Sequence, residues 1–117
     1  MRPGARTPEE LESLLEDAFV TRDAEALCEM FEEGAVLIAD TAQPEARGRE
    51  EIRRLAKALW EGDRTYVAEP QQVVQARRTA LVLGSGAISV VRRGGDGGWR
   101  YAIALLTQDH PTTKEEQ

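Results

Sequence analysis

The stretch Arg47–Gly62, RGREEIRRLAKALWEG, carries the clearest helical pattern in the sequence. Its large apolar residues recur with the spacing of a helix that buries one face, at Ile52, Leu55, Leu59 and Trp60. Gly62 follows the last of them, where a left-handed C-terminal stop is expected. The sequence after Gly62 is rich in strand signals. This helix must therefore lie across a sheet, and the space between them decides whether the protein has a pocket.

Two further helices are predicted before this stretch. Thr7 provides an N-cap, Pro8 occupies the first helical position, and Glu10 is placed to close a capping box. The apolar stripe of this first helix runs to about residue 20 through Leu11, Leu14, Leu15, Ala18 and Phe19. Asp23 caps a shorter helix that is predicted to end at Gly34. Its apolar residues, Leu27, Met30 and Phe31, are expected to dock on the first helix.

The remaining segments have the composition of strands and turns. Residues 35–39, AVLIA, form a short apolar run that predicts a strand, followed by a polar loop. Residues 65–76 predict a strand that Pro70 bends or interrupts. Residues 80–91 predict one long strand with a bulge or strong bend near Gly84 and Gly86. Arg77–Arg78 and the glycine-rich residues 94–98 predict turns, and residues 99–107 predict the last strand.

This order of elements predicts an α+β fold, in which three helices cover one face of a curved antiparallel sheet. The last strand is apolar on both faces. Its alternating sets are Tyr101, Ile103 and Leu105 on one side and Ala102, Ala104 and Leu106 on the other. An antiparallel sheet with one solvated face normally alternates apolar and polar residues. Because no helix is left over for the second face, we expect a homodimer through the sheet face.

Length and charge narrow the class of protein. The chain has 117 residues, which predicts one domain over residues 8–107, with a flexible lead-in (1–7) and a polar tail (108–117). The net charge is −6, with 16 acidic and 8 basic residues through Asp63. This balance argues against a nucleic-acid partner, and no apolar run reaches the ~20 residues of a membrane span. A single cysteine and the lack of a signal-peptide pattern predict a cytoplasmic protein.

Four short motifs, in this order, resemble the nuclear transport factor 2-like superfamily, which includes SnoaL-like and ketosteroid isomerase-like domains. The matching stretches are residues 22–27 (RDAEAL), 30–36 (MFEEGAV), 47–52 (RGREEI) and 96–100 (DGGWR). The resemblance extends from about Pro8 to Thr107 and implies a cone-shaped, cystatin-like fold. Members include isomerases, cyclases and dehydratases as well as proteins without a known reaction, so the fold alone does not define the function.

The resemblance also implies positions for catalytic groups. In ketosteroid isomerase-like members a carboxylate base lies near the end of the first strand, which corresponds here to Ala39, with Asp40 one residue later. The oxyanion-binding tyrosine corresponds to a position near Phe19, which cannot donate a hydrogen bond. The second acidic donor has no clear match, since Ala104 and Leu106 stand where it would be expected.

Asp40 is the candidate general base, because a carboxylate at the mouth of an apolar cavity has its charged form disfavoured. The competing interpretation is a turn residue that caps its own backbone. The expected pocket lining consists of Leu15, Phe19, Trp60, Tyr66, Trp99 and Tyr101. Each of these is also explained as a core residue. His110, the only histidine, is expected to be exposed in the tail.

No nucleophile elbow, phosphate-binding loop or metal-ligand cluster is present, so no cofactor or metal is expected. Two functions of different class remain open. The first is binding of a small apolar molecule, with or without cofactor-free acid–base catalysis of the isomerase, cyclase or dehydratase type. The second is a non-catalytic homodimeric module whose cone is plugged by its own apolar side chains.

Overall fold

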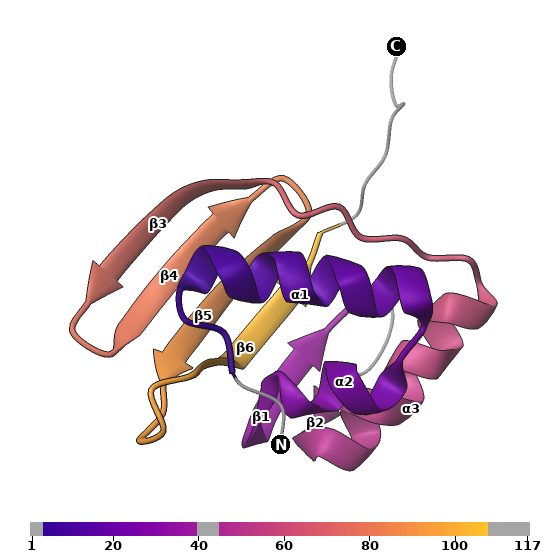
Figure 1. Ribbon diagram of the computed structural model, residues 1–117. Coiled ribbons are helices and arrows are strands. Elements are labelled where there is room, and N and C mark those ends of the chain that lie inside the picture. The colour runs from indigo at the N-terminus through magenta and orange to yellow at the C-terminus, as the bar shows by residue number, and fades with distance from the viewer. Residues whose placement is uncertain (1–3, 40–44, 108–117) are drawn as a thin grey trace, which may run out of the picture.

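The computed structural model describes residues 4–39 and 45–107 (Figure 1). Within these residues three helices accompany one six-stranded sheet. The helices are α1 (Pro8–Thr21), α2 (Ala24–Glu29) and α3 (Gly48–Glu61). The strands are β1 (Phe31–Ile38), β2 (Ala46–Arg47), β3 (Pro70–Ala76), β4 (Thr79–Gly84), β5 (Ala87–Arg93) and β6 (Trp99–Leu106). The predicted α+β class is confirmed.

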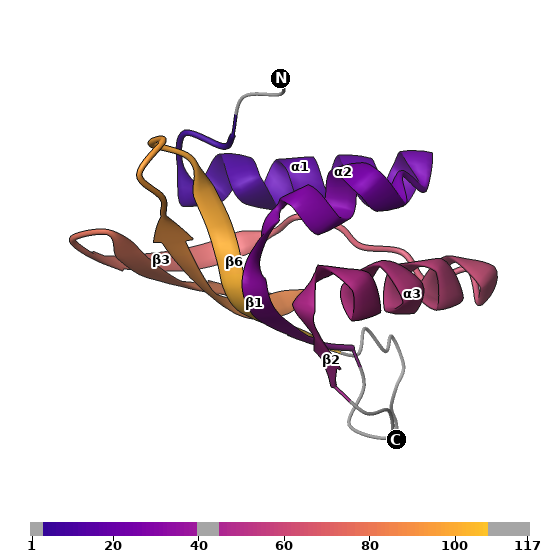
Figure 2. The ribbon, with the colours of Figure 1, turned by 90° about the horizontal axis from the view of Figure 1, so that it is seen from below.

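The strand order is β2-β1-β6-β5-β4-β3. Strands β3 to β6 form an antiparallel meander, and β2 pairs antiparallel with β1. Strands β1 and β6 pair in parallel. Between them the chain passes through β2, α3 and strands β3 to β5, a connection long enough to bring β6 back in the same direction as β1. The sheet is therefore mixed rather than wholly antiparallel. Figure 2 shows it curving around one layer that contains α1, α2 and α3.

Local chemistry explains where the helices begin. The Thr7 hydroxyl accepts from the Glu10 amide at 3.0 Å, and Asp23 caps α2 through the Ala26 amide at 3.0 Å. The apolar stripe of α3 is buried at Ile52, Ala56 and Trp60, as the pattern predicts. The predicted left-handed stop at Gly62 is wrong, since Gly62 has φ −90° and the next residue, Asp63, has φ +61°.

Two other predicted boundaries are also wrong. Helix α2 ends at Glu29 rather than at Gly34, because Phe31 already pairs with Tyr101 in the sheet. The predicted long strand 80–91 is a hairpin, in which β4 and β5 pair antiparallel on either side of residues 85–86. A Cβ on Gly84 would lie 2.9 Å from the Glu69 carbonyl oxygen, which explains why glycine is placed where the hairpin turns.

A β-bulge in β6 decides which way its side chains point. Ile103 pairs with Val90, but Val91 pairs with Tyr101, so Ala102 is an extra residue between these pairs. The bulge places Tyr101 on the same buried side as Ala104 and leaves Ile103 on the other side, 47% exposed. Simple alternation had grouped Tyr101 with Ile103, and that grouping is wrong.

The segment before α1 packs on the sheet. Ala5 is buried and its carbonyl oxygen accepts from the Trp99 amide at 2.9 Å. A Cβ added to Gly98, in the β5–β6 turn, would lie 3.1 Å from the Gly4 Cα. Two glycines therefore allow this close approach of backbones. Gly4 and Ala5, within the expected flexible lead-in, thus contribute to the wall around the start of β6.

Candidate functional site

Among the described residues, one acidic side chain is buried in the interior of the cone: Glu12 of α1, which is 1% exposed. The Tyr101 hydroxyl donates to Glu12 Oε2 at 2.5 Å, and the Tyr66 hydroxyl donates to Glu12 Oε1. The chain has two tyrosines in all, and both bind this one carboxyl group. A buried carboxyl needs such donors, because burial without hydrogen bonds is costly.

Sequence reasoning missed Glu12, although a signal was present. The buried residues of α1 include Pro8, Leu11, Glu12, Leu15 and Phe19, which follow the helical spacing i, i+3, i+4, i+7 and i+11. An acidic residue on that stripe predicts a buried carboxyl with dedicated partners. The partner Tyr101 depends on the β6 bulge, which the sequence did not reveal.

Burial raises the pKa of both tyrosines. For Tyr66 the main cause is loss of solvation, followed by the charge of Glu12. The pKa of Tyr101 is also raised well above its usual range by burial and then by Glu12. Both phenols therefore stay protonated and act as hydrogen-bond donors, which suits the binding of a carboxyl group.

Apolar side chains fill the space beside this cluster. The rings of Phe19 and Trp60 meet edge to face with centroids 5.7 Å apart, and Phe19 lies 5.8 Å from the Tyr66 ring. Leu15 is also buried, at 2% exposure. Five of the six expected lining residues thus lie in the packed interior: Leu15, Phe19, Trp60, Tyr66 and Tyr101. The sixth, Trp99, is buried at the start of β6.

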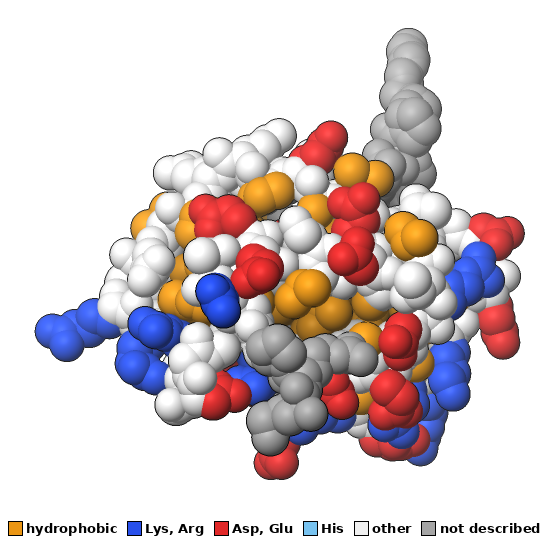
Figure 3. Space-filling view, in the orientation of Figure 1, with side chains coloured by type: hydrophobic (Ala, Val, Ile, Leu, Met, Phe, Trp, Pro, Cys, Tyr) orange, Lys and Arg blue, Asp and Glu red, His pale blue; other side chains and the backbone are white. Residues whose placement is uncertain are grey.

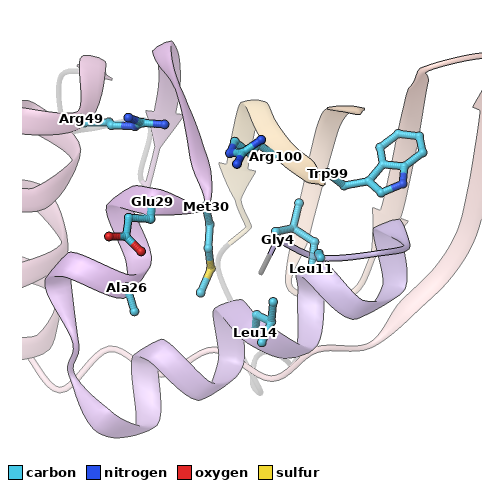
Figure 4. Close-up of a pocket in the computed structure, with 10 residues that line it drawn as sticks. Gly4, Leu11, Leu14, Ala26, Glu29, Met30, Arg49, Trp99 and Arg100 are labelled. Carbon is cyan, nitrogen blue, oxygen red and sulfur yellow. The ribbon is translucent and has the colours of Figure 1, made fainter. Parts of the chain in front are cut away.

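A cavity of about 400 Å³ lies between the α1–α2 pair and the start of β6 (Figure 4). Its apolar lining comes from Ala5, Leu11, Leu14, Ala26, Met30 and Trp99. Gly4, Glu29, Arg49 and Arg100 complete the wall. This volume is in the range of ordinary small-molecule pockets, which are mostly apolar with a few polar groups. Of the six residues expected to line a pocket, Trp99 lines this cavity.

The polar wall has an uneven charge balance. Arg100 is paired with Asp96 through two hydrogen bonds, of 3.1 and 2.7 Å. These bonds and the Gly98 amide hold the pKa of the Asp96 carboxyl well below its usual range. Arg49 donates through Nε to the Phe31 carbonyl oxygen at 2.9 Å.

Hydrophobic side chains reach the surface on the face that carries α1 and α2, with acidic side chains around them (Figure 3).

A second cavity, of about 300 Å³, lies at the other end of β6. Its wall is formed by Arg64, Thr65, Tyr66, Val67, Glu69, Ser85, Gly86, Leu106 and Thr107. It is more polar than the first cavity. Tyr66 is the expected lining residue found here, but its hydroxyl is directed to Glu12. Glu12 is among the lining residues of neither cavity.

Asp40 and His110 lie outside the described residues. The last described residue before Asp40 is Ala39, which directly follows β1 and is 1% exposed. Among residues 4–39 and 45–107, no group of three or more His, Cys, Asp or Glu side chains is placed to hold a metal ion. In the same part of the chain no helix has the length and apolar character needed to cross a bilayer.

Comparison with solved structures supports the fold. A ketosteroid isomerase-like protein from Erwinia carotovora atroseptica is similar with a TM-score of 0.72 at 19% identity, covering 88% of this chain and 94% of the other. A putative calcium/calmodulin-dependent protein kinase type II association domain from Thiobacillus denitrificans gives 0.73 at 18% identity, with 92% and 100% covered. A nuclear transport factor 2-like protein with a cystatin-like fold from Novosphingobium aromaticivorans gives 0.66 at 23% identity, with 88% and 81% covered.

At these identities the likeness shows the fold alone. No curated protein sequence matches the chain at a significant level. The SnoaL-like domain family, in contrast, matches residues 11–109, which is most of the chain. The chain therefore belongs to the SnoaL-like domain family.

Proposed function

We propose that this SnoaL-like domain binds a small, largely apolar molecule in the cavity between α1, α2 and the start of β6. The observation that carries the proposal is the cavity of about 400 Å³ with a mainly apolar lining. Leu11 and Leu14 of α1 and Met30, which follows α2, form much of this lining. Such convergence of apolar side chains on one space is typical of ligand sites.

The structure of the cone interior favours a domain that binds a ligand without catalysing a reaction. A general base must lie within hydrogen-bond reach of the proton that it removes. Glu12 is instead enclosed and occupied by Tyr66 and Tyr101. The cone is filled by packed aromatic and aliphatic side chains, as in the plugged module considered from the sequence. Acid–base catalysis by the predicted base, Asp40, is the less supported function.

The second part of the proposal is a homodimer through the outer face of the sheet. Four apolar side chains lie directly opposite one another across β3, β4, β5 and β6, namely Val74, Leu81, Val90 and Ile103. Val74, Leu81 and Ile103 are 49%, 38% and 47% exposed. A continuous apolar row is suited to a two-fold interface, in which the same patch from two copies meets itself.

An Ala26→Phe variant tests the proposed binding cavity. Ala26 is buried in α2 and lines it, so a phenyl group there would take up part of the cavity and obstruct a ligand. The probe is 1-octanol, measured by isothermal titration calorimetry and by the rise in melting temperature that ligand binding produces. We expect binding to the natural chain and to Ala58→Phe, an exposed position on α3, and loss of binding in Ala26→Phe. No binding to the natural chain, or equal binding to all three proteins, would reject the proposed cavity.

A further inference from the structure

We infer that the ligand of this cavity is an amphipathic carboxylate, an apolar body with one carboxylate group that Arg49 binds. This inference rests on the proposed function and adds the chemical class of the ligand. Arg49 enters from the first turn of α3, far in sequence from the apolar wall.

Arg49 lacks a carboxylate partner within the described residues. Its Nε donates to the Phe31 carbonyl oxygen at 2.9 Å. Two other half-buried arginines are paired with carboxylates: Arg100 binds Asp96 at 2.7 Å, and Arg53 lies 3.1 Å from Glu25 and 3.0 Å from Glu50. Arg64 resembles Arg49, since it binds a backbone carbonyl oxygen, that of Thr107, at 3.2 Å, but it lies at the other cavity. A partly desolvated guanidinium without a counter-charge is unfavourable, and an anion in the cavity would compensate it.

The geometry of Arg49 suits a carboxylate. Because Nε is bound to the Phe31 carbonyl, the two terminal nitrogens remain to bind a ligand. These nitrogens form a planar fork that matches the two oxygens of a carboxylate. Figure 4 shows Arg49 and Arg100 on one side of the cavity, with Leu14 and the Met30 side chain toward the other. A bound molecule would therefore meet charge at one end and apolar side chains along its body.

The neighbouring charges favour a single negative charge on the ligand. Arg100 is already neutralised by Asp96, so Arg49 supplies the positive charge of the wall that no carboxylate of the described residues pairs with. The one guanidinium of Arg49 balances a single negative charge. A phosphate monoester carries nearly two charges at neutral pH and is disfavoured relative to a carboxylate.

The test compares octanoate with 1-octanol, which have the same chain length but differ in charge, in calorimetric titrations at low salt. We expect the natural chain to bind octanoate about tenfold more tightly, since a hydrogen-bonded charged pair contributes on this scale. Arg49→Gln should lose this preference and keep its octanol affinity. Arg54→Gln, an exposed arginine of the same helix outside the cavity lining, removes the same charge and should keep the preference.

The outcomes separate the two proposals. If neither probe binds the natural chain, the proposed function fails. If both bind equally, or if Arg54→Gln has the same effect as Arg49→Gln, the cavity binds molecules but the inference about Arg49 is wrong. A stronger affinity for octyl phosphate than for octanoate would also overturn the carboxylate class. Should Arg49→Gln fail to fold, the natural chain still decides: its octanoate affinity should fall with added salt while its octanol affinity does not.

Discussion

The hydroxyl of Tyr101 donates a 2.5 Å hydrogen bond to Glu12, across 89 positions of sequence. This bond ties the first helix to the last strand, and the Tyr66 hydroxyl adds the segment between α3 and β3 to the same carboxyl group. The most buried acidic residue of the described chain thus joins three parts of the fold. We interpret this cluster as a polar support of the core, which leaves ligand binding to the cavity beside it.

Removing the carboxyl should destabilise the fold. Glu12→Ala leaves the hydroxyls of Tyr66 and Tyr101 buried without their acceptor, so we expect the free energy of unfolding to fall by about 2–4 kcal/mol. Glu12→Gln retains an acceptor oxygen and should cost less. Urea unfolding measures the change. Asp17→Ala, an exposed position on the same helix, should stay within about 0.5 kcal/mol, and an equally small effect in Glu12→Ala would contradict the interpretation.

The same cluster predicts loss of stability at alkaline pH. The pKa values of Tyr66 and Tyr101 are raised in the folded chain, whereas in the unfolded chain they stay near the ordinary value of about 10. Below that pH both states hold their protons and the full stability is present. Above it the unfolded chain loses protons first, so the free energy of unfolding decreases as pH rises.

The measurement is chemical denaturation over a series of alkaline pH values, with tyrosinate absorbance recorded in parallel. The double variant Tyr66→Phe, Tyr101→Phe should have a lower free energy of unfolding at neutral pH than the natural chain. Its free energy of unfolding should, however, lack the decrease at alkaline pH that tyrosine ionisation causes. A natural chain whose tyrosines ionise at their ordinary pKa while it remains folded would disprove the prediction.

Ser89 presents the opposite case, a buried polar group that the fold does not use. It is 2% exposed on β5, and its hydroxyl has no hydrogen-bond partner in the part of the chain that the structure describes. We expect Ser89→Ala to raise the free energy of unfolding by about 1 kcal/mol, because the unsatisfied hydroxyl is removed. Ser85→Ala, which removes the 2.6 Å bond to Glu69, should not stabilise the chain. Destabilisation by Ser89→Ala would reveal a missing partner.

The proposed dimer predicts a sharp effect of charge on the sheet face. Ile103→Lys places an ammonium group in the apolar row of β3, β4, β5 and β6, and we expect it to yield a monomer. Val20→Lys makes the same change at a 75% exposed position on α1 and should leave the dimer intact. Sedimentation velocity at micromolar concentration measures both. A natural chain that is monomeric under these conditions would refute the dimer.

Periodicity predicted the helices because their buried faces repeat over several turns. The stripe of α3 at Ile52, Ala56 and Trp60 is an example. The strand pattern failed at two irregular places: the bulge at Ala102 reversed the expected direction of Tyr101, and the turn at residues 85–86 divided one predicted strand into two. Both depend on pairing with a neighbouring strand, which a single sequence does not show.

The site was less predictable than the fold for the same reason. Of the expected lining residues, Trp99 lines the larger cavity and Tyr66 lines the smaller one. Leu11, Met30 and Arg49 come together only because α1, the start of β1 and α3 converge in space. The proposed base, Asp40, stays a prediction, since it lies outside the described residues.

The most direct test of the cavity uses the chain's two methionines, Met1 and Met30. Met30 lines the cavity, so a methyl-labelled methionine sample reports on ligand binding by nuclear magnetic resonance. We expect titration with octanoate to shift the Met30 methyl signal in a saturable manner, and Arg49→Gln to require about tenfold more octanoate for the same shift. A Met30 signal that does not move while octanoate binds elsewhere would contradict the account.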